Sequence, residues 1–120
     1  MTKKLSKEQQ KIALEGATER PFSSPLNYEK RAGIYYCASC HTELFSSDAK
    51  YDSGSGWPSF FKPAKKEIIG TSTDYDIGYE RVEVHCNNCG AHLGHVFEDG
   101  PKPTGLRYCI NGAVLDFKPD

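Results

Sequence analysis

The chain has 120 residues, of which 38% are hydrophobic, and its 15 Lys and Arg residues against 16 Asp and Glu residues give a net charge of −1. This length suits a single domain over residues 1–120, and the balanced charge argues against a nucleic-acid or anionic-membrane partner. The sequence contains neither the roughly 20 apolar residues of a membrane-spanning helix nor the apolar segment of a secretory signal. We therefore expect a cytoplasmic protein, and its small size and modest charge favour a monomer.

A helix pattern occurs near the N-terminus, over residues 3–16. Ser6 and Gln9 have the spacing of a capping box, in which the two side chains satisfy backbone N–H groups at the start of a helix. Gly16 follows as a typical stop signal. We expect a short N-terminal helix region over residues 1–19.

The remaining residues, 20–120, contain patterns of strands and turns. Residues 20–32 include two prolines and predict an irregular segment that wraps the body of the molecule. Residues 79–86 alternate between apolar and polar side chains, which predicts a half-buried strand. Asn111-Gly112 between two apolar segments predicts a type I′ hairpin. The expected fold class is mainly β, with mostly antiparallel strands.

Four of the five cysteines form two C-x-x-C pairs, namely Cys37, Cys40, Cys86 and Cys89. Each tight turn brings two thiolates onto one metal, and two such pairs complete a tetrahedral site for Zn²⁺. Four thiolates leave no free coordination position, so we expect one structural Zn²⁺ per chain. The alternative, a pair of redox motifs, is disfavoured because neither pair follows a βαβ pattern.

The fifth cysteine, Cys109, lies in a predicted strand two residues after Arg107 and two before Asn111. Side chains alternate along a strand, so Arg107 and Cys109 share one face, while Leu106, Tyr108 and Ile110 face the core. A neighbouring guanidinium favours the thiolate, which is the nucleophilic form of cysteine. Equally, Cys109 may be read as a small buried hydrophobe beside a surface arginine, and the local pattern leaves both readings open.

Two histidines, His92 and His95, would face opposite sides of a regular strand. They converge only through a helical turn or a bend at Gly94, and a converged pair would offer a proton donor near neutral pH. The alternative places one histidine in the core and one on the surface. Asp99 has the position to orient a histidine, although such a residue is also typical of turns.

The single tryptophan, Trp57, follows two nearby glycines and precedes Phe60 and Phe61. One interpretation places these three rings in a core aromatic cluster. The other makes Trp57 the wall of a pocket for a small apolar group.

Together these motifs resemble the methionine-R-sulfoxide reductases, the MsrB family, in its zinc-containing form. The resemblance spans about residues 17–117 in the right order. Besides the two cysteine pairs, the matching stretches are residues 17–22, 53–60, 92–97, 99–101 and 103–111.

The resemblance implies two antiparallel sheets and an enzyme that reduces the R epimer of methionine sulfoxide, preferably in oxidised proteins, within residues 20–120. It implies that Cys109 attacks the sulfoxide sulfur and becomes a sulfenic acid, and that His95, paired with His92, donates the proton. The other residues that the resemblance assigns to catalysis or substrate binding are Asp99, Arg107, Asn111, Trp57 and Phe97. A non-catalytic, zinc-clamped protein-binding module is the alternative function.

One position departs from the family pattern. Ser55 stands where many relatives carry the cysteine that resolves the sulfenic acid by forming a disulfide, which serine cannot do. Two explanations stay open, namely direct reduction by an external thiol and an engineered replacement of that cysteine. The expected reductant is thioredoxin or a small thiol.

Overall fold

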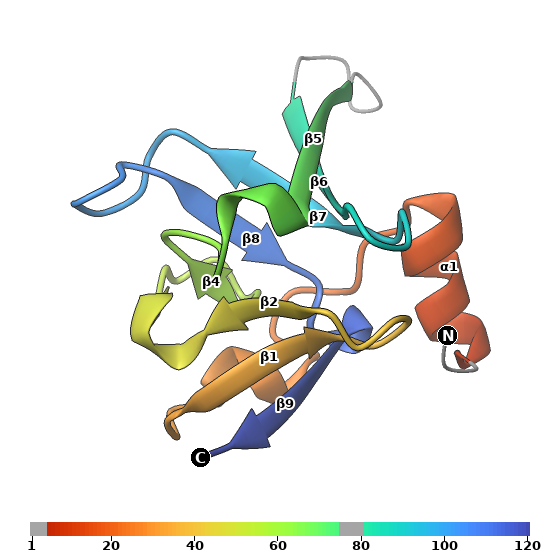
Figure 1. Ribbon diagram of the computed structural model, residues 1–120, viewed down its shortest axis with the longest axis horizontal. Coiled ribbons are helices and arrows are strands. Elements are labelled where there is room, and N and C mark those ends of the chain that lie inside the picture. Colours follow the sequence, from red (N-terminus) through yellow and green to blue (C-terminus); the bar gives the residue numbers. More distant parts are fainter. Residues whose placement is uncertain (1–4, 75–80) are drawn as a thin grey trace.

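The computed structural model describes residues 5–74 and 81–120, and Figure 1 labels its elements. The helical elements are α1 (Lys7–Glu15) and the 3-10 turns η1 (Pro25–Tyr28), η2 (Ser47–Ala49), η3 (Lys66–Ile68) and η4 (Gly112–Val114). The strands are β1 (Gly33–Cys37), β2 (Glu43–Ser46), β3 (Lys50–Tyr51), β4 (Ser59–Phe60), β5 (Ile69–Asp74), β6 (Arg81–Cys86), β7 (His92–Phe97), β8 (Arg107–Ile110) and β9 (Leu115–Pro119).

The strands form two antiparallel sheets, which confirms the expected fold class. One sheet has the order β2-β1-β9, and the other has the order β3-β4-β8-β7-β6-β5. The larger sheet is strongly twisted, so that β5 and β6 point away from the small sheet in Figure 1. Within the described residues, no helix has the length and apolar character needed to cross a membrane.

Helix α1 begins and ends where the local sequence predicts. The Ser6 side chain accepts from the Gln9 N–H and the Gln9 side chain accepts from the Ser6 N–H, so the capping box is formed. Gly16 adopts a left-handed φ of 74° and closes the helix. Of the predicted span 3–16, the helix covers Lys7–Glu15, and residues 3 and 4 lie outside the described residues.

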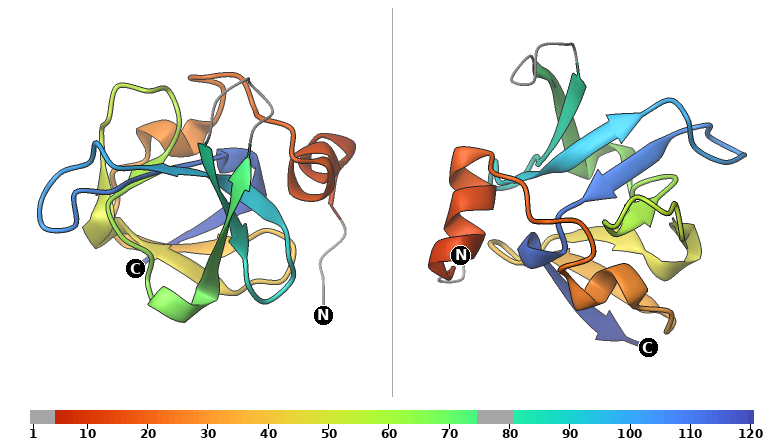
Figure 2. Two further views of the ribbon diagram at one scale, coloured as in Figure 1. Left: turned by 90° about the horizontal axis from the view of Figure 1, so that it is seen from above. Right: turned by 180° about the vertical axis from the view of Figure 1, so that it is seen from behind.

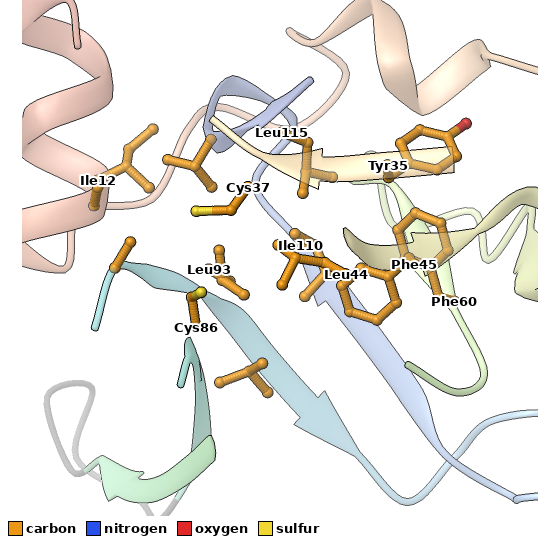
Figure 3. Close-up of a cluster of buried hydrophobic side chains, with 14 of the residues drawn as sticks. Ile12, Tyr35, Cys37, Leu44, Phe45, Phe60, Cys86, Leu93, Ile110 and Leu115 are labelled. Atoms are coloured by element: carbon orange, nitrogen blue, oxygen red, sulfur yellow. The ribbon is translucent and has the colours of Figure 1, made fainter. Parts of the chain in front are cut away.

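The core lies between the two sheets (Figure 3). Its aromatic centre consists of Phe45 stacked on Phe60 with ring centroids 4.3 Å apart, and Tyr35 edge-on to Phe60 at 5.1 Å. Leu93 and Ile110 from the larger sheet are completely buried between the sheets. Trp57 is only half-buried and lies outside this core cluster, whereas Phe60 is part of it.

The hairpin predicted at Asn111-Gly112 is wrong. Strand β8 pairs with β4 and β7, whereas β9 pairs with β1, so the two strands belong to different sheets. Asn111 has φ −70° and leads into η4, whereas a type I′ turn requires a positive φ. The physical reason is that Ile110 and Leu115 both bury their side chains between the sheets, which carries the chain from one sheet to the other.

Two further predictions, the strand over 79–86 and the irregular segment over 20–32, are confirmed for the residues that the structure describes. Strand β6 covers residues 81–86 of the predicted strand 79–86, and its first two predicted residues lie outside the described ranges. Residues 20–32 are irregular as predicted, apart from η1.

Candidate active site and cysteine cluster

A row of polar side chains crosses the larger sheet. On three adjacent strands, Ser59 of β4 lies opposite Cys109 of β8, which lies opposite His95 of β7. Glu83 of β6 lies opposite His95 and extends the row. Because directly opposed residues share one face of a sheet, the pairing register itself brings a thiol, an imidazole and a carboxylate together.

Arg107 holds the Cys109 sulfur. Its Nη1 donates to Cys109 Sγ at 2.8 Å, and its Nε and Nη2 donate to the two oxygens of Asp99 at 2.7 and 3.0 Å. The guanidinium also lies 4.5 Å from the centre of the Phe97 ring. The hydrogen bond from Arg107 lowers the pKa of Asp99, and the same bond raises the pKa of Arg107. Asp99 and Phe97 thus fix a positively charged donor against the sulfur.

Serine hydroxyls cover the other side of the sulfur. Ser55 Oγ lies 3.6 Å and Ser59 Oγ lies 3.7 Å from Cys109 Sγ. Ser53 joins them, with its Oγ 2.7 Å from each of the other two hydroxyls. Residue 55 therefore lies within contact distance of the thiol.

The two histidines converge through a β-bulge. His85 pairs with His92 and Val84 pairs with Gly94, so Leu93 is an extra residue in β7. The imidazoles of His92 and His95 are edge to face with centroids 5.4 Å apart, and each residue is 7% exposed. Glycine is required at 94 because a Cβ there would collide with the Cys109 carbonyl of β8. Of the two predicted routes to convergence, a bulge beside Gly94 and not a helical turn brings the imidazoles together.

Glu83 fixes the orientation of His92. Its carboxylate lies 2.7 Å from His92 Nδ1 and 3.1 Å from His85 Nδ1, and it accepts from Ser72 Oγ at 2.9 Å. Burial alone would raise the pKa of Glu83, but these three hydrogen bonds outweigh burial and lower it. Glu83 could not be predicted as a site residue, because strand alternation indicates the face on which its side chain lies but not the residue that it meets on the next strand.

A cavity of about 270 Å³ lies over this row of side chains. Six of the residues singled out from the sequence line it, namely Trp57, His95, Phe97, Arg107, Cys109 and Asn111. Thr18 and Arg81, which the sequence analysis missed, line it as well. Three other predicted residues contact lining residues without lining the cavity themselves. His92 packs against His95, Asp99 accepts from Arg107, and Ser55 lies beside Cys109.

Trp57 and Asn111 form walls of this cavity. The Trp57 indole N–H donates to the Glu19 carbonyl at 3.0 Å, and Trp57 is therefore a pocket wall rather than a core residue. Asn111 is 3% exposed, and its amide donates to the Leu93 carbonyl at 2.9 Å. Both side chains are thus fixed by backbone groups from distant segments.

The four paired cysteines form a second cluster, at the ends of β1 and β6. In each turn the N–H of the first cysteine donates to the carbonyl five residues on, at 2.8 and 2.9 Å. The carbonyl of the same cysteine accepts from the N–H four residues on, at 2.8 and 2.7 Å. His41 and Gly90, at equivalent places, both have a left-handed φ, of 63° and 79°. The two turns therefore repeat one local geometry.

The sulfur atoms fit a tetrahedral metal. The sulfurs of Cys37 and Cys89 are 3.7 Å apart, as are those of Cys40 and Cys86, and all four lie within 4.8 Å of one another. A Zn–S bond of about 2.3 Å gives sulfur separations of about 3.8 Å in a tetrahedron. The cluster therefore has the ligands and the spacing to hold a metal ion.

Comparison with known proteins places the chain in one family. Residues 5–119 match the model of the SelR domain. The chain is 56% identical over 115 residues to the peptide methionine sulfoxide reductase MsrB of Pseudomonas aeruginosa (strain UCBPP-PA14), an alignment covering 96% of this chain and 87% of that protein. It is 55% identical over 119 residues to the protein of the same name from Burkholderia thailandensis, covering 98% of this chain and 83% of that protein. The chain therefore belongs to the MsrB family of peptide methionine sulfoxide reductases.

Proposed function

We propose that this chain reduces the R epimer of methionine sulfoxide, preferably in oxidised proteins, and that Cys109 is its nucleophile. The observation that carries the proposal is the position of Cys109 Sγ, which lines the cavity and accepts a 2.8 Å hydrogen bond from Arg107. The name of the relatives, peptide methionine sulfoxide reductase, supports the substrate class.

In the proposed reaction the Cys109 thiolate attacks the sulfoxide sulfur while His95 protonates the sulfoxide oxygen. His95 suits this role because it lies opposite Cys109 in the pairing of β7 with β8 and lines the same cavity. The attack forms a bond between the two sulfurs, and this bond breaks as the hydroxyl group passes from the methionine sulfur to Cys109. A thiolate and a protonated sulfoxide thereby become a sulfenic acid and methionine. Two electrons move from Cys109 to the substrate. Glu83 holds His92, and the His92 ring packs against the His95 imidazole and keeps it in place.

Selection between the R and S epimers depends on the cavity having both aromatic and polar walls. The aromatic rings of Trp57 and Phe97 suit the S-methyl group, whereas His95 and Asn111 offer polar groups to the oxygen. Exchanging the epimers would place the oxygen on the indole and leave polar groups unpaired. A buried polar group without a partner is costly, and this mismatch discriminates strongly.

We propose that an external thiol, either thioredoxin or a small thiol, reduces the sulfenic acid directly. Ser55 Oγ lies 3.6 Å from the Cys109 sulfur, where a cysteine would have disulfide reach, but serine cannot form that bond. The other four cysteines are gathered in their own cluster. We further propose a monomer in the cytoplasm, where a reducing environment keeps all five cysteines reduced.

We propose that Cys37, Cys40, Cys86 and Cys89 hold one structural Zn²⁺. Bound there, the ion would supply four strong bonds that tie the end of β1 in the small sheet to the end of β6 in the large sheet. Because four thiolates fill its coordination shell, it has no part in the steps above.

Separated R and S epimers of a methionine sulfoxide peptide test the proposal, with dithiothreitol as reductant. We expect turnover of the R epimer only, and no turnover by the Cys109→Ser variant. Equal rates on both epimers would refute the assigned specificity. Equal rates for the chain and Cys109→Ser would refute the assigned nucleophile.

A further inference from the structure

The segment after α1 runs along the active-site cavity and contacts the loop before Trp57. Residues 17–24, which we call the strap, run from α1 to η1 and pass close to η4 (Figure 2). Thr18 of the strap lines the cavity. The Phe22 N–H donates to the Gly56 carbonyl at 2.6 Å, directly before Trp57. The strap therefore lies against the same loop that carries the indole.

Glu19 of the strap is a buried acid that the proposed reaction does not use. It is 7% exposed, and its two carboxylate oxygens accept from the backbone N–H groups of Gly112 at 2.8 Å and Ala113 at 2.9 Å. Burial raises the pKa of Glu19, although these two N–H donors oppose the rise. The carboxylate anchors the strap to η4, immediately after Asn111.

The backbone of the same residue holds two walls of the cavity. The Glu19 N–H donates to the Asn111 side-chain oxygen at 3.0 Å, and the Glu19 carbonyl accepts from the Trp57 indole N–H at 3.0 Å. One residue thus makes four hydrogen bonds, two through its side chain to η4 and two through its backbone to cavity walls. Those walls come from segments 38 and 92 residues away in the sequence.

We propose that Glu19 is a positioning residue. Its buried carboxylate fixes the strap on η4, so that the Glu19 backbone holds the Trp57 indole and the Asn111 amide in place around the cavity that Cys109 lines. The inference rests on the proposed function, in which these two side chains meet the S-methyl group and the oxygen of the sulfoxide. Glu19 is not among the residues that line the cavity, and its hydrogen bonds described above go to Trp57 and to residues 111–113.

The test uses the fact that Trp57 is the single tryptophan of the chain, so its fluorescence reports this indole alone. In Glu19→Ala we expect red-shifted emission and stronger quenching by acrylamide, because the indole loses its fixed acceptor. We expect kcat/KM for the R epimer to fall roughly 10- to 100-fold, as small misplacements of positioning groups do. Preference for the R over the S epimer should fall with it, while the alkylation rate of Cys109 stays unchanged.

Two further variants make the result decisive. Glu15→Gln, at an exposed acid of α1, is the matched control and should leave emission and activity unchanged. Glu19→Gln keeps one acceptor oxygen and should show a smaller change than Glu19→Ala, with the fold retained by circular dichroism. Unchanged Trp57 emission and epimer preference in both Glu19 variants would overturn the proposal, as would loss of folding in both. A shift of emission in a chain without any sulfoxide reduction would instead refute the proposed function and leave the anchoring role standing.

Discussion

At the scale of single residues, the proposed chemistry depends on what surrounds one sulfur atom. Cys109 Sγ has a guanidinium donor on one side and two serine hydroxyls on another. The arginine is in turn held by Asp99 in a two-bond pair. The sequence predicts the shared face of Arg107 and Cys109 because strand alternation is local. It does not predict the serine contacts, since the Ser59 contact depends on the pairing of β4 with β8 and the Ser55 contact on the path of the loop before β4.

Replacing Arg107 with Met tests the effect of the guanidinium on the sulfur. Hydrogen bonds to charged groups contribute about 1.5–3 kcal/mol, and the guanidinium donates one to the Cys109 sulfur, so the alkylation rate of Cys109 at pH 7 should fall roughly tenfold or more in Arg107→Met. Iodoacetamide labelling followed by peptide mass mapping measures this rate. An unchanged rate would mean that Arg107 does not activate the sulfur.

The pH dependence of stability tests Glu83. Its pKa is lower in the folded chain than its ordinary value of 4.5, so it stabilises the fold above that value and loses this contribution as the pH falls through the folded-state pKa. Glu83→Gln should therefore lower the free energy of unfolding at pH 7 by about 1–3 kcal/mol. Urea unfolding of both proteins at pH 7 and below pH 4 should show the difference shrinking in acid. A difference that is independent of pH would contradict the assigned hydrogen bonds.

At the scale of elements, features that depend on local sequence were predictable. The capping box of α1 and the turns of the two cysteine pairs involve residues only a few positions apart. The hairpin at Asn111 failed because the side chain of this residue is committed to Glu19 and Leu93, which lie far away in the sequence. Glu83 and Glu19 were missed for the same reason, as their partners are set by strand register and by the path of the strap.

The close approach of β7 and β8 predicts a large effect of a single methyl group. In Gly94→Ala the new Cβ would collide with the Cys109 carbonyl, so the strands must separate and His95 must move away from the sulfur. We expect the free energy of unfolding to fall by about 2–4 kcal/mol, with loss of most reductase activity. Gly16→Ala, whose Cβ would meet open space at a left-handed φ, should cost only about 1–2 kcal/mol and leave activity intact. Similar losses in both variants would contradict the proposed close contact.

At the scale of the whole molecule, the cysteine cluster links the sheets that enclose the core. Cys37 ends β1 of the small sheet and Cys86 ends β6 of the large sheet, and Figure 3 shows both beside the buried cluster. A metal bound by these cysteines would hold together segments that the chain joins only through a long connection. The sequence predicts this cluster from spacing alone, whereas the mutual placement of the sheets required the structure.

Metal removal tests the structural role of the cluster. We expect one Zn²⁺ per chain by elemental analysis, and a strong chelator at pH 7 should unfold the protein or markedly lower its melting temperature. Cys109→Ser should bind the same amount of Zn²⁺, because its sulfur lies outside the cluster. A chelated chain that melts at the original temperature would show that the fold does not depend on the metal.

The fate of Cys109 after one turnover tests the central claim most directly. The protein is mixed with one equivalent of an R-sulfoxide peptide without reductant, then treated with dimedone and analysed by intact and peptide mass. In a matched Ser55→Cys variant, the new thiol beside the sulfur should instead form a disulfide with Cys109 and block the dimedone adduct. The account predicts one dimedone adduct, at Cys109, in the unaltered chain. A disulfide between Cys109 and one of the four other cysteines of the unaltered chain would contradict this prediction. Formation of methionine with no change at Cys109 would contradict it as well.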